Sequence, residues 1–380
     1  MARPANLDLA HMRAALLLAE RGLGRVWPNP AVGCVIVDPA GHVVGRGFTQ
    51  KGGRPHAETE ALRMAGEAAR GATAYVTLEP CSHHGKSPPC ADALMAAGIA
   101  LCVVALEDPY PQVNGQGVAR LKAAGIAVDL GLLSAEAEEV NLGFLTKVRL
   151  GRPMVTLKLA TSLDGRIAAA TGDSQWITGE TARAHAHRLR AIHDAVLIGS
   201  GTALADDPEL TCRLPGLADR SPIRIVLDRR LRLVAPSKLL RPAPASAPGS
   251  PGSSGTWIVT AHGHPAVSLE PYRRAGLEIV EAATGADGRL DPAAILRALG
   301  ERGLTRILVE GGAQVAASLV KADLVDRLIW FRAPGLIGGD GLASLAEIGL
   351  DRVAVMPRFE RVACGTAGED LVETYRRKPR

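Results

Sequence analysis

The stretch TLEPCSHHGKSPPC, residues 77–90, follows an apolar run, GATAYV, that predicts a β-strand. Its last twelve residues hold two cysteines, two histidines, a lysine and three prolines. Proline cannot donate a backbone hydrogen bond, so we expect a stiff loop that leads to a helix beginning near Cys90. The role of two thiols at the ends of such a loop decides how the first half of the chain is interpreted.

Composition limits the classes of protein that need to be considered. A chain of 380 residues predicts two domains, and 47% hydrophobic residues supply ample core. No run of eighteen apolar residues occurs, so we expect no membrane span. The first 22 residues predict an amphipathic helix rather than a signal peptide, and we therefore expect a cytoplasmic protein with reduced cysteines.

The charge pattern argues against a nucleic-acid partner. The formal net charge is only +5, and the basic residues are spread along the chain. Aromatic residues make up 3%, which leaves few side chains on which bases could stack. We expect a small anionic molecule as the partner instead.

Hydrophobic periodicity predicts strands and helices that alternate in both halves. In the first half a helix over 7–21 precedes a hairpin over 31–49, a helix from His56 to Gly71, and further strand and helix pairs. The pattern restarts after residue 149, so we predict an α/β sandwich over 1–149 and an α/β domain over 150–380. Residues 235–255 are rich in Pro, Ser, Ala and Gly and predict a surface loop.

Four residues of the first half form a pattern typical of zinc deaminases. His56, Cys81 and Cys90 supply the three ligands of a catalytic zinc site, and Glu58 follows the histidine by two positions. The cysteines of that signature are normally separated by two residues, whereas eight separate them here. Two alternatives stay open: a structural site with His83 or His84 as fourth ligand, and two independent core cysteines. Cys34, Cys102, Cys212 and Cys364 are predicted to be core residues.

Together with PNPAVGCVIV and HAETEAL, the long loop resembles the deaminase half of the bacterial bifunctional riboflavin-biosynthesis deaminase/reductase. The resemblance implies a cytidine-deaminase-like α/β/α sandwich in which zinc is held by His56, Cys81 and Cys90, with Glu58 as proton shuttle. It implies that Asn29, His83 and Lys86 contact the substrate, 2,5-diamino-6-ribosylamino-4(3H)-pyrimidinone 5′-phosphate. Members of that family often carry a histidine where this chain has Thr49.

The second half contains a strand, two glycines and a helix, RILVE-GG-AQVAASLV, a turn that can approach phosphate. GSGTAL at 199–204 has Leu204 where a Rossmann fingerprint needs its third glycine, so a Rossmann domain is disfavoured. With KLATSLDGRIAAATGDSQWIT, LADDPELT and APGLIGG, this half resembles the family's NADPH-dependent reductase, which has a dihydrofolate-reductase-like fold.

By that resemblance, NADPH and substrate occupy defined positions of the second half. The cofactor would contact Ala160, Trp176, Thr202, Asp206, Arg229, Gly312, Ala313, Gln314, Val315, Ala316, Ala317 and Ser318. The substrate would contact Ser174, Arg190, Leu210, Arg213 and Glu310. The reaction implied is reduction of the ribosyl group to ribityl, with Lys158, Asp206 or Glu310 as alternative proton donors.

Two other functions compete with a two-step biosynthetic enzyme. A nucleic-acid base deaminase would need an aromatic-lined basic groove, which the composition argues against. A zinc-stabilised binding module without activity would not need Glu58, Asp206 or Arg213. We expect one zinc ion in the deaminase domain, NADPH in the reductase domain, a phosphorylated pyrimidine nucleotide as substrate, no nucleic acid or membrane partner, and a homo-oligomer.

Overall fold

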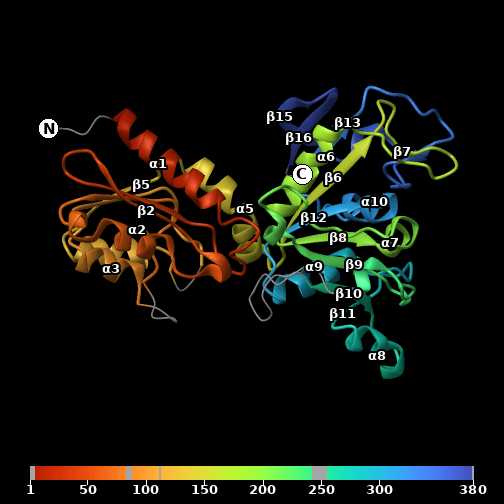
Figure 1. The fold of residues 1–380 in the computed structure, drawn as a ribbon, viewed down its shortest axis with the longest axis horizontal. Coiled ribbons are helices and arrows are strands. Elements are labelled where there is room, and N and C mark those ends of the chain that lie inside the picture. Colours follow the sequence, from red (N-terminus) through yellow and green to blue (C-terminus); the bar gives the residue numbers. More distant parts are fainter. Residues whose placement is uncertain (1–4, 83–87, 111–112, 242–254, 379–380) are drawn as a thin grey trace. The chain divides into compact units, whose positions relative to one another are not determined.

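The computed structural model describes residues 5–82, 88–110, 113–241 and 255–378. The chain divides into two compact units, Met1–Gly151 and Arg152–Arg380. The predicted division at 149/150 lies two residues before this one. Each unit is built around its own sheet (Figure 1).

The first unit contains a five-stranded sheet with the order β2-β1-β3-β4-β5. β1 pairs antiparallel with β2 and β3, whereas β3, β4 and β5 are parallel. The strands are β1 (Gly33–Val37), β2 (Val43–Phe48), β3 (Thr73–Val76), β4 (Leu101–Val104) and β5 (Ala127–Leu130). The helices are α1 (Ala5–Glu20), α2 (Ala57–Ala65), α3 (Cys90–Ala96), α4 (Gln116–Ala123) and α5 (Ser134–Leu150), with 3₁₀ turns at Lys51–Gly53 and Gly66–Ala69.

Helices cover both faces of this sheet. Alternate strand residues such as Cys34, Val76 and Cys102 pack with α2, α3 and Leu121 of α4 in one apolar core. The intervening residues face α1, where the Tyr75 hydroxyl donates to Asp8 at 2.6 Å, and α1 also packs against α5. The predicted α/β/α arrangement is therefore present, with α2 and α3 on the same face.

The second unit contains a nine-stranded sheet with the order β11-β10-β9-β8-β12-β6-β13-β16-β15. All neighbours from β11 to β13 are parallel, and the hairpin of β15 and β16 extends the sheet antiparallel. The strands are β6 (Met154–Thr161), β8 (Ala195–Gly199), β9 (Ile223–Leu227), β10 (Thr256–Ala261), β11 (Glu278–Ala282), β12 (Arg306–Gly311), β13 (Arg327–Arg332), β15 (Phe359–Ala367) and β16 (Asp370–Arg377). A separate pair joins β7 (Arg166–Ala168) to β14 (Leu342–Ala343).

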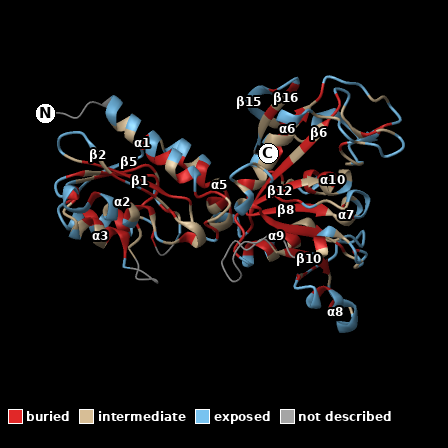
Figure 2. Cartoon of the chain, in the orientation of Figure 1, coloured by how far each residue is buried: buried red, intermediate tan, exposed pale blue. Residues whose placement is uncertain are grey.

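Helices connect the parallel strands of this sheet. They are α6 (Glu180–Ala191), α7 (Ser200–Asp206), α8 (Ala266–Arg274), α9 (Pro292–Glu301) and α10 (Ala313–Lys321), with 3₁₀ turns at Ala218–Arg220, Lys238–Leu240 and Val353–Val355. Local sequence explains some boundaries: the Asp291 carboxylate accepts from two backbone amides of α9, and Pro292 occupies its first position. Figure 2 shows burial concentrated on the strands, while α8 turns an exposed face outward.

Several sequence predictions need correction. The helix expected to run to Gly71 ends at Ala65, because Gly66 adopts a left-handed φ of 53° and a 3₁₀ turn follows. Cys34, Cys102 and Cys212 are buried as predicted, but Cys364 is exposed on β15, an edge strand whose residues are mostly exposed. The hairpin of β15 and β16 was not predicted, since its exposed outer strand lacks an apolar face. Residues 242–254 of the predicted 235–255 loop lie outside the described residues.

Candidate active sites

The three predicted zinc ligands come together in the first unit. His56 is the residue immediately before α2, Cys90 begins α3, and Cys81 follows β3. The His56 Nδ1 atom lies 3.3 Å from Cys90 Sγ and 3.7 Å from Cys81 Sγ. All three ligand atoms lie within 4.8 Å of one another, which is the spacing of a metal site with three protein ligands.

The electrostatics of the two thiols fit a divalent cation. Hydrogen bonds from the Cys90 side chain, and then from His56, lower the pKa of Cys81 to about 4 despite its burial. The Cys81 thiolate beside it, together with burial, raises the pKa of Cys90 well above its usual value. The pair therefore holds one negative charge, and a Zn²⁺ ion would stabilise both sulfurs as thiolates. The donor set of one imidazole and two sulfurs fits zinc.

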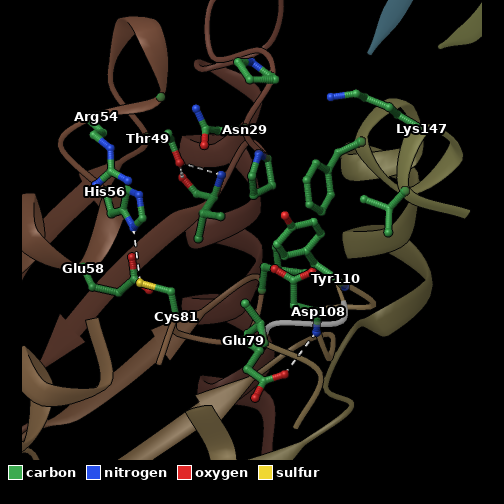
Figure 3. A pocket seen from close by; sticks show the side chains of 18 residues that line it. Asn29, Thr49, Arg54, His56, Glu58, Glu79, Cys81, Asp108, Tyr110 and Lys147 are labelled. Atoms are coloured by element: carbon green, nitrogen blue, oxygen red, sulfur yellow. Dashed lines mark hydrogen bonds between the residues drawn. The ribbon is translucent and has the colours of Figure 1, made fainter. Parts of the chain in front are cut away.

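Glu58 lies in the first turn of α2 with only 3% of its surface exposed. Burial raises the pKa of this carboxyl to about 7. Figure 3 shows the Glu58 side chain beside His56 and the Cys81 sulfur. A carboxyl that exchanges protons near neutrality is suited to general acid–base catalysis.

A cavity of about 320 Å³ opens onto this cluster (Figure 3). His56, Glu58 and Cys81 line it, and so does Asn29, one of the predicted substrate contacts. Asn29 approaches so closely to Gly53 that a Cβ atom there would lie 1.9 Å from the Asn29 side-chain nitrogen. Gly53, with φ of 82°, therefore allows Asn29 to occupy the cavity wall.

Thr49 also lines the cavity, but its hydroxyl is already engaged. It accepts from the Val32 amide at 3.0 Å and donates to the Val32 carbonyl at 3.4 Å. Thr49 is buried, so it stabilises the cavity wall rather than offering a free polar group. His83 and Lys86, the other predicted substrate contacts, lie outside the described residues.

Sequence reasoning missed part of this cavity. Arg54, Tyr110, Phe144 and Lys147 line it together with the predicted residues. Phe144 and Lys147 are three residues apart on α5, a spacing that places both on one helix face. Nothing in the sequence indicated which face of α5 would meet the deaminase motifs.

Glu79 links the segment that carries Cys81 to residues 108–118 through hydrogen bonds. Its buried carboxylate accepts from the backbone amides of Gly115 at 2.9 Å, Val118 at 3.0 Å and Asp108 at 3.2 Å. The first two amides belong to the start of α4, and the third precedes Tyr110 in the cavity wall. One carboxylate therefore fixes the start of the segment 79–82 against the wall of the cavity.

In the second unit, a cavity of about 420 Å³ collects residues from distant parts of the chain. Seven of the residues singled out in the sequence line it: Lys158, Ala160, Ser174, Trp176, Arg190, Arg213 and Glu310. Lys158 and Ala160 come from β6, Arg190 from α6 and Glu310 from β12. The parallel strands therefore gather these side chains near their carboxyl ends, where open α/β sheets bind ligands.

A buried ion pair forms one wall of this cavity. Arg190 donates from Nε and Nη2 to the two carboxylate oxygens of Glu310, at 2.6 and 2.8 Å. Although burial opposes it, the Arg190 charge and hydrogen bonds, with Lys158 adding to them, hold the pKa of Glu310 at about 2. Burial lowers the pKa of Lys158. Glu310 is thus a firmly ionised group.

The glycine turn between β12 and α10 lies opposite α7. A Cβ atom on Gly312 would stand 2.9 Å from the hydroxyl oxygen of Thr202, so only glycine leaves this space open. Gly312 precedes the first turn of α10, whose free amides favour an anion. A phosphate-bearing cofactor fits this turn, with Gly312, Ala313, Gln314 and Val315 nearest the helix start.

The remaining predicted reductase residues occupy less direct positions. The side chains of Ala316 and Ala317 are buried, and Ser318 donates its hydroxyl to Val315 O, so these three would act through their backbone or not at all. Leu210 is buried in the core of the unit.

Three charged residues complete the predicted set. Asp206 ends α7, and burial raises its pKa. Arg229 follows β9, half-buried, and its carbonyl accepts from His264 at 2.9 Å. Arg213 is exposed and pairs with Glu209 at 3.3 Å. Arg213 lines the cavity together with Arg190 and Glu310, whereas Arg229 is not among its lining residues.

Fold and sites together define a zinc-dependent deaminase unit followed by an α/β unit whose strand ends form a separate ligand cavity. The family model "Cytidine and deoxycytidylate deaminase zinc-binding region" matches residues 5–106, and the model "RibD C-terminal domain" matches residues 153–372. The riboflavin biosynthesis protein RibD of Escherichia coli K12 is 44% identical over 375 residues, which cover 96% of this chain and 98% of that protein.

Solved structures agree with the sequence comparison. Form 1 of Acinetobacter baumannii RibD is 36% identical with a TM-score of 0.86, over 98% of this chain and 99% of that one. A Thermotoga maritima diaminohydroxyphosphoribosylaminopyrimidine deaminase/5-amino-6-(5-phosphoribosylamino)uracil reductase is 35% identical with a TM-score of 0.83, over the same shares of the two chains.

The chain belongs to the RibD family of bifunctional deaminase/reductases in riboflavin biosynthesis. The predicted fold class, a cytidine-deaminase-like domain followed by a dihydrofolate-reductase-like one, is confirmed. Within the described part of the chain, every helix is too short or too polar to cross a membrane.

Proposed function

We propose that the first unit hydrolyses the C2 amine of 2,5-diamino-6-ribosylamino-4(3H)-pyrimidinone 5′-phosphate. The observation that carries this proposal is the placement of buried Glu58 beside three metal ligands, at a cavity that also holds Asn29. His56, Cys81 and Cys90 would hold Zn²⁺. When bound, zinc supplies a Lewis acid that brings the pKa of a water molecule toward neutrality.

Glu58 performs the proton transfers of this reaction. Its ionised carboxylate accepts a proton from the attacking water and returns it to the amine, which leaves as ammonia. A pKa of about 7 lets the same group act as base and then as acid. Asn29 orients the substrate from the cavity wall, and His83 and Lys86 stay predicted contacts.

We propose that the second unit then reduces the ribosyl group to ribityl with NADPH, giving 5-amino-6-ribitylaminouracil 5′-phosphate. The cofactor would supply a hydride to C1′ of the opened ribosylamine. Gly312 and the start of α10 would hold its phosphates, with Ala160, Trp176, Thr202, Asp206 and Arg229 as further contacts. The steric opening at Gly312 opposite Thr202 supports this placement.

The substrate would lie along Ser174, Arg190, Leu210, Arg213 and Glu310. Glu310 is ionised and held by Arg190, which favours it as an orienting group over a proton donor. Asp206 ends α7 and is not among the residues that line the cavity. Lys158 is half-buried and lines the same cavity, and we assign to it the proton that accompanies reduction. An ammonium whose pKa is lowered by burial gives up its proton more readily.

One experiment tests both halves of this function. The full-length protein is incubated with the diaminopyrimidinone nucleotide, with and without NADPH, and the products are identified by mass spectrometry. Without NADPH we expect the deaminated ribosyl compound and ammonia, and with NADPH the ribityl compound. Absence of ammonia release from zinc-loaded protein would contradict the deaminase assignment, and a ribosyl compound that persists with NADPH would contradict the reductase assignment.

We further propose a homo-oligomeric, cytoplasmic enzyme. All six cysteines are free thiols, which suits a reducing compartment. β15 ends the nine-stranded sheet and carries exposed Val362, so this edge is a candidate interface between copies. Light scattering coupled to size-exclusion chromatography would measure the assembly directly.

A further inference from the structure

Two permanent positive charges occur among the described residues that line the deaminase cavity, Arg54 and Lys147. Arg54 precedes the metal ligand His56 by two residues. Figure 3 shows Arg54 beside His56, whereas Lys147 extends from the other side of the cavity, beyond Asn29. One cation therefore lies at the reacting end of the cavity and the other lies away from it.

The position of Lys147 is fixed by the way α5 is attached to the cavity wall. The buried Asn141 side chain accepts from the Ala31 amide at 2.9 Å and donates to the Ala31 carbonyl at 3.0 Å. This reciprocal pair joins α5 to the segment that carries Asn29. Phe144 follows Asn141 by about one helical turn, and Lys147 and Val148 follow it by about two. All three side chains line the cavity from α5.

Besides Glu58, the cavity wall contains two acidic side chains, Glu79 and Asp108, and both accept hydrogen bonds from backbone amides. Glu79 accepts from three amides, and the Asp108 carboxylate accepts from the Tyr110 amide at 2.9 Å. Thr49 is occupied by Val32. Among the described residues of the cavity wall, an anionic part of a ligand would be attracted to Arg54 or Lys147.

The chemistry of the substrate selects between the two cations. The carbon that loses its amine is C2, which must lie at Glu58 and the metal ligands. The ribosylamino arm leaves the ring at C6 and carries the phosphate at its far end, away from C2. The phosphate therefore extends away from Arg54 and toward the opposite side of the cavity.

We propose that Lys147 binds the 5′-phosphate of the nucleotide in the deaminase site, an inference that rests on the proposed deaminase function. The ammonium is a compact charge with three donors, which suits a phosphate that needs no fixed two-pronged geometry. Lys147 thereby sets the preference of the first unit for a phosphorylated substrate over the free nucleoside.

The test compares deamination of the phosphorylated substrate with deamination of the same compound after removal of its phosphate. The variants are Lys147→Met, which keeps the length of the side chain without its charge, and Lys147→Arg, which keeps the charge. Arg149→Met is the matched control, because Arg149 lies on the same helix, is exposed and pairs with Glu138 outside the cavity. Zinc content and the reductase rate of each protein report on folding.

We expect Lys147→Met to lower kcat/KM for the phosphorylated substrate by about 10- to 100-fold, mainly through KM, and to leave the free nucleoside unaffected. Lys147→Arg should retain most of the preference, and Arg149→Met should match the unmodified protein on both substrates. An equal loss on both substrates, or no loss on either, would overturn the assignment of Lys147. If the unmodified zinc-loaded protein deaminates neither compound, it is the proposed function that fails.

Discussion

The two sites of this protein differ in how their charges are balanced. In the deaminase site, two cysteines and a histidine converge on one point, and the Cys81 sulfur raises the pKa of the Cys90 thiol beside it. In the reductase cavity, Arg190 and Glu310 already neutralise each other through two short hydrogen bonds. The sulfur ligands of the first site would be stabilised as thiolates by a bound cation. In the second site, the Glu310 carboxylate is already balanced by the Arg190 guanidinium. Changes to the first should therefore affect metal binding and rate, and changes to the second should also affect the stability of the unit.

The largest effect should follow from removal of a metal ligand. Cys90→Ser should lose the zinc ion and with it all measurable deamination, because three protein ligands are the minimum for a catalytic site. Elemental analysis and ammonia release check this. Cys364→Ser, at an exposed thiol, should retain both, and NADPH-dependent reduction should survive in either variant. Full zinc content in folded Cys90→Ser protein would show that the cluster is not the metal site.

Glu58→Gln should keep zinc and lower deamination by about 10² to 10⁴-fold, because the amide cannot accept a proton from water. Glu60→Gln is the control on the same helix, since Glu60 is paired with exposed Arg63 and does not line the cavity. Both variants should still reduce the deaminated nucleotide with NADPH. Loss of both activities from Glu58→Gln, in folded protein, would mean one coupled site in place of two.

The buried ion pair of the second unit offers a test of stability as well as activity. Arg190→Met should destabilise this unit by about 3–5 kcal/mol, because it leaves the largely buried Glu310 charge without its hydrogen-bonded partner. The double variant Arg190→Met with Glu310→Gln should recover much of that stability while reduction stays impaired. Denaturant titration measures the first effect and NADPH oxidation the second. Arg188→Met, exposed on the same helix, should change neither.

The smallest effect concerns the acid stability of the second unit. His193 is buried, and burial lowers its pKa from 6.5 to about 3. Between these two pH values, His193 is protonated in the unfolded chain but neutral in the folded unit. The contribution of neutral His193 to the free energy of unfolding is therefore fully present above pH 6.5 and is lost as the pH falls toward 3. His193→Gln should flatten the fall in melting temperature below pH 6.5, whereas exposed His262→Gln should not. Equal slopes in all three proteins would contradict the assignment of this proton to His193.

Local chemistry explains why the metal site could be predicted from the sequence. His56 and Cys90 lie at the starts of α2 and α3, and Cys81 lies five residues after β3. These boundaries are marked in the sequence by Pro, Gly and apolar periodicity. One histidine and two cysteines at such positions are typical of a metal site. The resemblance of the surrounding motifs then indicated the family, which the comparisons confirm.

Other features depended on contacts between segments that are far apart in the sequence. The helix expected to reach Gly71 ends at Ala65, where Gly66 adopts a φ of 53° and a 3₁₀ turn follows. Cys364 lies on an edge strand rather than in the core, which its apolar neighbours alone could not indicate. Such outcomes depend on which strand forms the edge of a sheet, a property of the whole domain.

The sequence by itself determined the residue types of the zinc cluster, the strand and helix content of both halves, and the family. Only the tertiary structure decided that Lys147 would enter the deaminase cavity and that Arg190 would pair with Glu310 across 120 positions of the chain. The physical reason is that periodicity reports which face of an element is apolar, whereas the neighbour that covers that face is chosen by packing of the whole domain.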